Sequence, residues 1–465
     1  MEREWHSRTR HRGTNCSATR HSPMPARVFQ IMYDLRASYW FVPSIMALLA
    51  IVLGAVMVWL DAGPAAGLLD GLGWYQKAKP DGAHQVLSTI AGSMITVAGV
   101  VFSITIVAIA YAASQYGPRI LTNFMSDRGN QVTLGTFIST FVYCLVVLRT
   151  IRGGDEGQFV PQLAVMVGLF LALCSIAVLI FFIHHVPRSI HINTVVAQIG
   201  KQLLHSMHKR FPAQIGDPSD EGEAEGRCTE GELALVDGVA VAKIGSPANG
   251  YIETVDDETL METASASDLV LRLHHRPGDF VMCGQPLISA WPVKSVDDKA
   301  KRELQQSYSI GSNRTPAQDT FFLVDELVEI AARALSSGVN DPYTAITCLD
   351  WLAAAAAELI RRRIPSSRRV DKHGLVRVVA LPDNFAEFIE RGFGRMRQYL
   401  ARDMNAAAHA FDSLGAVGRL CESTELTHAL GTEADRLMSL AEKELQGPSL
   451  QHVRDHYREA AAHLA

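Results

Sequence analysis

The sequence lacks the paired cysteines that hold metal clusters or disulfide frameworks. None of its seven cysteines belongs to a Cys-x-x-Cys pair, and no two lie close together: Cys16, Cys144, Cys174, Cys228, Cys283, Cys348 and Cys421. This scatter argues against a zinc ribbon, an iron–sulfur site and a disulfide framework. Isolated thiols fit a reducing compartment. We therefore expect no metal ion and no cofactor.

The sequence also lacks a strong charge excess and the common catalytic motifs. Its 43 basic and 48 acidic residues give a net charge of −5, which argues against a nucleic-acid-binding protein. No Gly-x-x-x-x-Gly-Lys-Ser/Thr loop, Gly-x-Ser-x-Gly elbow or His-Glu-x-x-His pair occurs. An enzyme is therefore not the expected class, and we assign no catalytic residue.

The apolar residues are unevenly distributed along the chain. A mean hydropathy of +0.10 is typical of a soluble protein, yet four long blocks without charge precede residue 184. A helix rises ~1.5 Å per residue, so each block can cross a hydrocarbon core of ~30 Å. We predict a membrane domain over 37–184 with spans at about 38–60, 86–113, 130–149 and 160–183.

Basic residues indicate on which side of the membrane each segment lies. The N-terminal segment 1–36, predicted to be a disordered extension, is rich in arginine, whereas the loop 61–85 has only Lys77 and Lys79 as basic residues. Loops rich in Lys and Arg stay on the inner side of the membrane. We therefore expect the N-terminus to lie inside. Four spans return the chain to that side, so residues 185–465 and the C-terminus are expected in the cytoplasm.

The second predicted span carries a stripe of small and polar residues. Gly92, Thr96, Gly99 and Ser103 are spaced four, three and four apart, which places them on one helix face. The stripe packs closely against a neighbouring helix, or it lines a water-filled path in an oligomer. Arg119, just after the helix end, is expected at the inner headgroup level. The opposite face is apolar: Ile90, Met94, Val97, Val101 and Ile104.

The cytoplasmic region is predicted to be of the α+β class. A helix and an acidic linker occupy 185–232, a small β module occupies 233–295, and a mainly helical domain, expected to form a bundle, occupies 300–465. Two turns in the module, Arg-Pro-Gly-Asp at 276–279 and Cys-Gly-Gln at 283–285, need the backbone freedom of glycine. With the strands predicted around these turns, the module resembles the barrel-sandwich fold of biotinyl and lipoyl carrier domains. The modified lysine of those carriers has no counterpart here, because Lys294 lies outside the expected barrel. We therefore expect a β module without a prosthetic group.

One turn of the helical domain has two interpretations. Glu329 and Arg333 are spaced for an i, i+4 pair on a predicted helix. In the turn that follows, Asp341 suits an N-cap and Pro342 suits the first helical position. The segment is therefore explained as a helix–turn–helix corner. The alternative is a functional site that combines Glu329, Arg333, Asn340 and Asp341.

Several short motifs resemble a known family. They are Ser-Tyr-Trp-Phe-Val-Pro at 38–43, Ser-Gln-Tyr-Gly-Pro-Arg at 114–119, Gly-Tyr-Ile at 250–252, Arg-Pro-Gly-Asp-Phe-Val at 276–281, Ala-Leu-Ser at 334–336 and Asn-Asp-Pro at 340–342. Together they resemble the bacterial predicted membrane proteins of domain of unknown function 2254 over about residues 33–445. The resemblance implies an integral membrane protein with about four spans and no catalytic residues to carry over.

Three functional classes remain open on these observations. The first is an oligomeric, channel- or transport-like protein of the bacterial inner membrane whose cytoplasmic region assembles or gates a path. The second is a non-transporting scaffold or sensor that docks a cytoplasmic partner. The third is a membrane-proximal enzyme that uses the corner at Asn340 and Asp341. The expected partners are the lipid bilayer and further copies of the chain, without nucleic acid.

Overall fold

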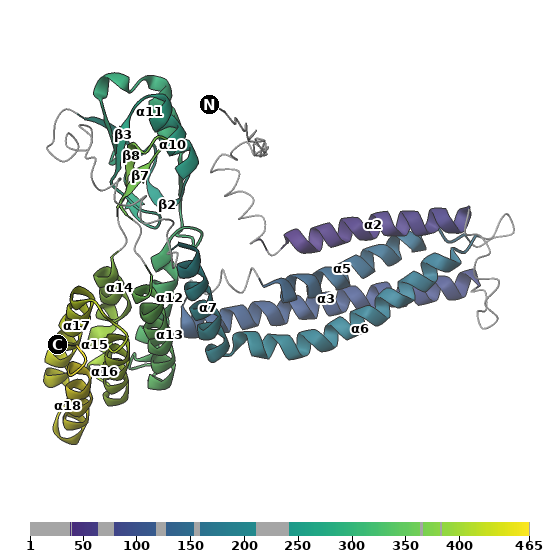
Figure 1. Cartoon of the computed structure of the whole chain (residues 1–465). Coiled ribbons are helices and arrows are strands. Elements are labelled where there is room, and N and C mark those ends of the chain that lie inside the picture. The colour runs from purple at the N-terminus through teal and green to yellow at the C-terminus, as the bar shows by residue number, and fades with distance from the viewer. Residues whose placement is uncertain are drawn as a thin grey trace, which may run out of the picture.

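The protein consists of a long helical bundle joined at one end to an α/β body (Figure 1). The computed structural model describes residues 38, 40–63, 79–117, 127–152, 159–210, 241–362, 366–381 and 384–464. The predicted N-terminal extension 1–36, Arg119, and the acidic linker from 211 to 232 lie outside the described residues.

Apolar helices form the bundle. They are α2 (Phe41–Ala62), α3 (Pro80–Tyr116), α5 (Arg128–Leu148) and α6 (Gln162–Ile190). Among the described residues five helices are long and apolar enough to cross a membrane, and the fifth is α13 (Pro342–Ile360). The helix α13 meets these criteria although it packs against other helices of the α/β body. Length and composition alone therefore do not fix the number of membrane spans, and four spans stay a prediction.

Large side chains and a few internal hydrogen bonds hold the bundle together. Phe137 and Tyr143 of α5 are buried in its core, and the Tyr143 hydroxyl donates to the Ala164 carbonyl at 2.8 Å. At the end far from the α/β body, the Asp61 carboxylate accepts the backbone N–H groups of Leu163 and Ala164 at 3.0 and 2.9 Å. An acidic side chain at a helix N-terminus is favourable, so Asp61 fixes α6 against α2.

The helical part of the α/β body surrounds a separate apolar core. The helix α7 (Ile192–Arg210) follows α6 and packs along α12 and α13. Gly200 of α7 allows this contact, since a Cβ there would lie 2.2 Å from the Trp351 ring. The remaining helices are α12 (Thr320–Ala334), α14 (Phe385–Gly392), α15 (Arg397–Leu400), α16 (Met404–Gly418), α17 (Thr424–Glu444) and α18 (Gly447–Ala461), with a 3-10 turn η3 (Gly394–Met396).

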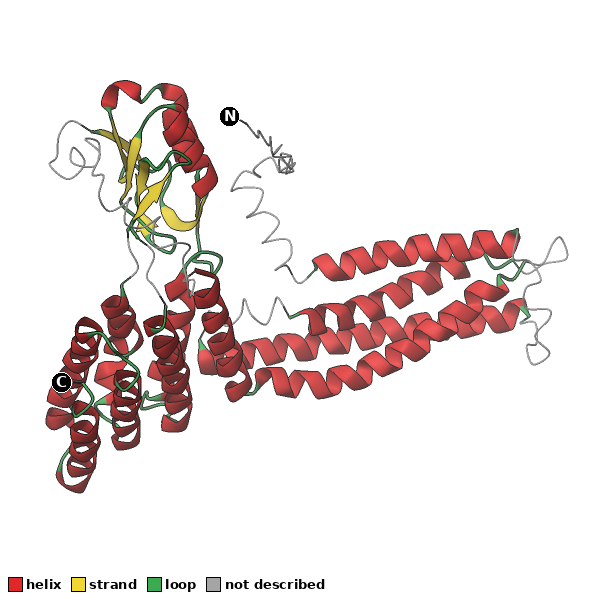
Figure 2. Cartoon of the chain, viewed as in Figure 1, coloured by secondary structure: helices red, strands yellow, loops and turns green. Residues whose placement is uncertain are grey.

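The strands gather in one lobe above these helices (Figure 2). One sheet has the order β1-β5-β3-β8-β7 and the other the order β4-β2-β6. The strands are β1 (Ala242–Gly245), β2 (Gly250–Val255), β3 (Val270–Leu273), β4 (Phe280–Val281), β5 (Pro286–Trp291), β6 (Tyr308–Gly311), β7 (Arg368–Val370) and β8 (Val376–Val379). The lobe also contains α10 (Asp257–Ala266), the 3-10 turn η2 (Val293–Ser295) and α11 (Asp298–Gln306).

The sheets extend beyond the segment predicted to form the β module. Strands β6, β7 and β8 follow residue 295, yet β6 pairs with β2, and β8 pairs in parallel with β3. A parallel pair needs a long crossover connection, and here the chain forms α12 and α13 before it returns to the sheet. The resemblance to carrier domains therefore stays a prediction, whereas a mixed α/β region is present.

Replacing Gly135 by leucine should destabilise the bundle. A Cβ at this position would lie 2.4 Å from Met46 Sδ and 3.3 Å from the Pro43 Cα of α2, and overpacking of this kind costs roughly 2 kcal/mol. We expect purified Gly135→Leu in detergent to unfold at a lower thermal midpoint than the wild type, with unfolding measured by tryptophan fluorescence. Gly82→Leu is the control, because nothing lies within 4 Å of its Cβ. Equal midpoints for the two variants would contradict the packing described.

Candidate functional site

The stripe on α3 faces away from the rest of the chain. Gly92, Thr96, Gly99 and Ser103 are all exposed, and nothing lies within 4 Å of a Cβ built on either glycine. The Thr96 and Ser103 hydroxyls donate to carbonyls of their own helix, those of Gly92 and Gly99, at 2.8 Å each. No described helix of the same chain therefore packs on this face.

The opposite face of α3 packs into the bundle, as the sequence pattern indicates. Ile90, Met94 and Val101 are buried and belong to the bundle core. Ile104 departs from the prediction, because its side chain is 47% exposed. The two faces of α3 therefore have different environments: among the described residues, the apolar face packs into the bundle core and the striped face has no packing neighbour.

The helix α3 is longer than a membrane is thick. Its 37 residues correspond to about 55 Å, against ~30 Å for the hydrocarbon core. Its middle contributes to the bundle core, whereas Ala112 is buried in the helical core of the α/β body and Ile109 packs against that core. One uninterrupted helix thus connects both cores (Figure 1).

Two predicted site residues hold the end of α3. Arg333 of α12 donates from Nη1 to the Ser114 carbonyl at 2.9 Å, where a cation stabilises the negative end of a helix. Gly117 has φ +110, and a Cβ there would lie 2.6 Å from Glu329 Oε1. Glycine is therefore required at Gly117 for two reasons, its backbone conformation and the close approach of Glu329. We call this contact between α12 and the end of α3 the α3 clamp.

The other two residues of the predicted site have a local role. Asp341 is the N-cap of α13, as the sequence predicts: its carboxylate accepts from the Thr344 N–H at 3.2 Å and from the Thr344 hydroxyl at 2.6 Å. Asn340 precedes it in a left-handed conformation with φ +52. Capping engages both carboxylate oxygens of Asp341, as the corner interpretation expects. The functional site at Asn340 and Asp341 stays a prediction.

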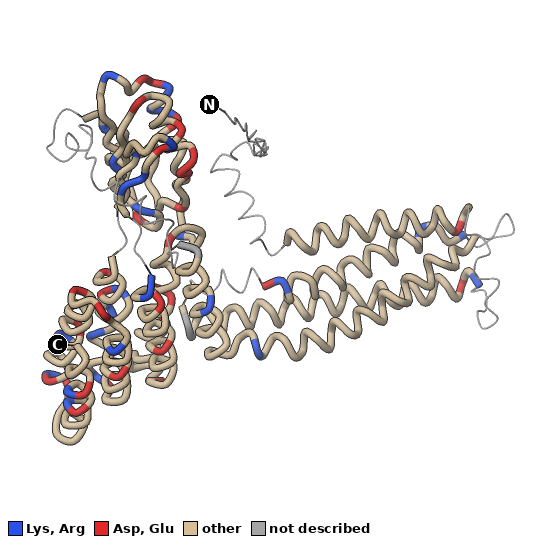
Figure 3. The backbone as a smooth tube through the Cα atoms, viewed as in Figure 1, with Lys and Arg blue, Asp and Glu red and all other residues tan. Residues whose placement is uncertain are grey.

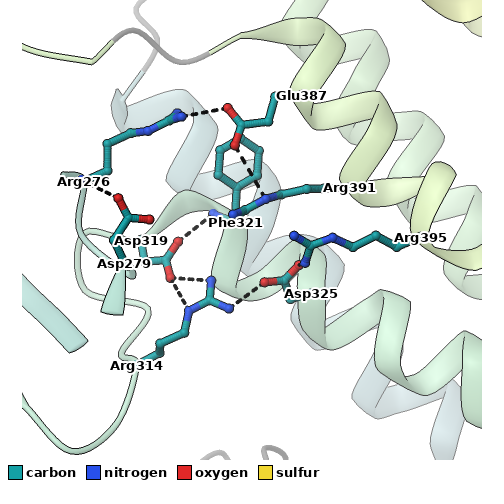
Figure 4. Close-up of polar contacts among 9 residues, drawn as sticks. All are labelled: Arg276, Asp279, Arg314, Asp319, Phe321, Asp325, Glu387, Arg391 and Arg395. Carbon is teal, nitrogen blue, oxygen red and sulfur yellow. Dashed lines mark hydrogen bonds and ion pairs between the residues drawn. The ribbon is translucent and has the colours of Figure 1, made fainter. Parts of the chain in front are cut away.

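A buried ion-pair network joins the strand lobe to the helices (Figure 4). Arg314 binds Asp319 at 2.6 Å and Asp325 at 2.6 Å, and Arg395 binds the other oxygen of Asp325 at 2.8 Å. Burial raises the pKa of the Asp319 carboxyl, and Arg314 opposes that shift. Burial alone would lower the pKa of Arg314, but its two carboxylate partners outweigh burial and raise it.

The Arg-Pro-Gly-Asp turn at 276–279 completes this network, which we call the lobe junction. Arg276 binds Glu387 of α14 at 2.8 Å, and Arg391 lies 4.3 Å above the Phe321 ring. Gly278 has φ +95, and a Cβ there would lie 2.2 Å from Asp319 Oδ2. The cavity among these residues measures about 20 Å³, which holds about one water molecule. The space between the two sides of the junction is therefore much smaller than the cavities that usually hold small-molecule ligands.

Sequence reasoning identified the turn at 276–279 but missed the junction. Arg276 and Glu387 are 111 residues apart, and Arg395 and Asp325 are 70 apart. No local pattern predicts contacts over such separations. The only available signal was the glycine of the turn, which indicated an unusual backbone but gave no partner.

Comparisons with known proteins agree with a membrane protein. Residues 36–416 match the family model described as "Predicted membrane protein (DUF2254)". The chain is 31% identical over 425 residues to uncharacterised proteins of Mycobacterium bovis and Mycobacterium tuberculosis, and the match covers 90% of this chain and 79% of each relative. No solved structure matches the chain.

Removing the arginine of the α3 clamp should loosen the end of α3. In Arg333→Ala the Ser114 carbonyl loses its donor, a loss of about 1 kcal/mol for a contact near the surface. We expect amide hydrogen exchange in the last turn of α3 to accelerate about fivefold, measured by mass spectrometry. Arg402→Ala is the control, because Arg402 is exposed and its ion pair with Glu444, at 3.3 Å, lies away from α3 in the sequence and joins it to α17. An unchanged exchange rate in Arg333→Ala would show that the clamp does not hold α3.

Removing the central acid of the lobe junction should be strongly destabilising. Asp325 is buried and binds two arginines, and removal of one partner of a buried ion pair costs roughly 3 kcal/mol or more. We expect a large fall in the thermal midpoint of Asp325→Ala. Asp455→Ala should change it little, because the Asp455–Arg458 pair is exposed. Similar midpoints for the two variants would contradict the role given to Asp325.

Proposed function

We propose that this chain, which belongs to the DUF2254 family of predicted membrane proteins, forms a channel- or transport-like homo-oligomer in the bacterial inner membrane. The observation that carries the proposal is the stripe of α3, which is exposed along its whole length within one chain. In an oligomer the stripes of several copies would face one another and line the path.

Four spans with both termini inside fit the distribution of charge. Charged residues gather at the two ends of the bundle and leave its middle free of them (Figure 3). Arg128 and Arg188 lie at the end that joins the α/β body, and basic residues favour the inner side of the membrane. In this proposal α2, α3, α5 and α6 span the bilayer as a domain over 37–184, and the α/β body is cytoplasmic.

The fifth apolar helix is assigned to the cytoplasmic side. Cys348, Leu349 and Leu352 of α13 are fully buried in the core of the α/β body, and Gly200 of α7 lies against Trp351 on another face. A helix enclosed by other helices gains its apolar environment from them, so α13 does not need a lipid environment.

A path between copies is favoured over a path through one bundle. The bundle interior is filled by side chains with at most 1% exposure, among them Leu87, Phe137, Tyr143 and Val147. Close packing of this kind excludes water. The stripe on α3, by contrast, offers small residues and hydroxyls without any described neighbour, which suits both close helix contact and a hydrated lining.

Control of the path is assigned to the α/β body. The α3 clamp fixes the inner end of the stripe-bearing helix to α12, and the lobe junction fixes the other end of α12 to the strand lobe. A shift of the strand lobe would therefore move α3, which is the coupling that gating requires.

Enlarging two residues of the stripe should block the path. We expect Gly99→Leu combined with Ser103→Leu to reduce ion flux in vesicles that contain the purified protein to the level of empty vesicles. Ala55→Leu is the matched control, because Ala55 is a small exposed residue on α2. Normal flux in the stripe variant would contradict a path lined by α3. A wild-type oligomer without flux would instead support the scaffold or sensor alternative.

A further inference from the structure

We propose that the exposed face of α7 binds the phosphate groups of anionic lipids in the inner leaflet. The inference rests on the orientation given under the proposed function, but not on a conducting path. It assigns a lipid-binding surface to Lys201, His205 and the amide side chains beside them.

The helix α7 uses only one face within the chain. Val196, Ile199 and Leu203 are fully buried in the core of the α/β body, and Gly200 permits close contact with Trp351. The residues on the other face form an open, shallow surface to which only α7 contributes among the described residues: Asn193, Thr194, Ala197, Gln198, Lys201, Gln202 and His205.

The charge of this face fits an anion. The sequence of α7 contains no acidic residue. The side chains of Lys201 and His205 make no ion pair or hydrogen bond with any residue that the structure describes. On another part of the helix, His208 is paired with Glu358 at 3.1 Å. Lys201 and His205 therefore have room for an acidic group from outside the chain.

The polar neighbours of Lys201 suit a phosphate. The side-chain amides of Asn193, Gln198 and Gln202 can donate hydrogen bonds, and a lysine ammonium provides the charge that phosphate oxygens need. Carboxylates that would repel a phosphate do not occur among the described lining residues.

The position of α7 places this face near the membrane surface. Arg188, in the last turn of α6, marks the inner end of the bundle, and His191 breaks the helix in an extended conformation with ψ 124. From there α7 runs alongside α12 and α13, where the bundle meets the α/β body (Figure 1). Among the described residues, neither α12 nor α13 contributes to the unpacked face of α7. In the proposed orientation α7 lies beside the headgroup layer, where anionic lipids attract basic residues.

The test compares lipid binding by the full-length chain and by Lys201→Gln. The purified protein in a neutral detergent is titrated with phosphatidylglycerol and, separately, with phosphatidylcholine, and bound lipid is counted by native mass spectrometry. We expect tighter binding of phosphatidylglycerol, and about a fivefold loss of that affinity in Lys201→Gln, the equivalent of one basic residue near an anionic surface. Adding His205→Gln should weaken binding further.

Three results would overturn the inference. They are equal binding of the two lipids by the wild type, an unchanged affinity for phosphatidylglycerol in Lys201→Gln, and displacement of the lipid by an equal concentration of inorganic phosphate. Lys299→Gln is the matched control, because Lys299 is an exposed lysine on α11 in the strand lobe. Lipid binding without ion flux would refute only the proposed path, whereas flux without a role for Lys201 would refute only this inference.

Discussion

The structure depends on one stiff element, the helix α3, which belongs to two apolar cores at once. Its middle is buried in the bundle, and Ala112 is buried in the core of the α/β body. Since a continuous helix keeps its backbone hydrogen bonds along its length, neither core can shift along the axis without the other. The second connection differs, because α6 and α7 are separated by a break at His191. The bundle and the α/β body are therefore connected in two ways: through the continuous helix α3, and through the α6–α7 connection, which is interrupted at His191.

The helix α12 connects α3 to the strand lobe. Asp319, the N-cap of α12, accepts the Phe321 N–H at 3.0 Å and also binds Arg314 in the lobe junction. One helix length away, Arg333 binds the end of α3. Both contacts use charged groups at helix ends, where the helix dipole strengthens them. The strand lobe, α12 and α3 are thus connected through a continuous series of contacts, and a movement of the strand lobe can reach the helical bundle through them.

The sequence predicted the features whose signals are local. Blocks without charge indicated the apolar helices, and Asp341 with Pro342 indicated the start of α13. The apolar face of α3 was predicted from its spacing, and Ile90, Met94 and Val101 on that face are buried. Ile104, predicted on the same face, is exposed, because burial depends on which neighbours a helix meets. The pairing of β3 with β8 and the Arg276–Glu387 contact of the lobe junction could not be predicted, since each joins residues that are about one hundred positions apart. The glycines at 117 and 278 were visible, but their partners Glu329 and Asp319 were not.

The central claim is that copies of α3 face one another through their stripes. Thiol cross-linking in native membranes tests this claim most directly. The variant Ser103→Cys is compared with the unsubstituted chain, called the parent, and with Ala177→Cys. Ala177 is the control position, because it is an exposed residue of α6. A short bifunctional thiol reagent should join two copies of Ser103→Cys and leave Ala177→Cys and the parent as single chains. Ser103→Cys that remains a single chain, or that is joined no better than Ala177→Cys, would contradict the account.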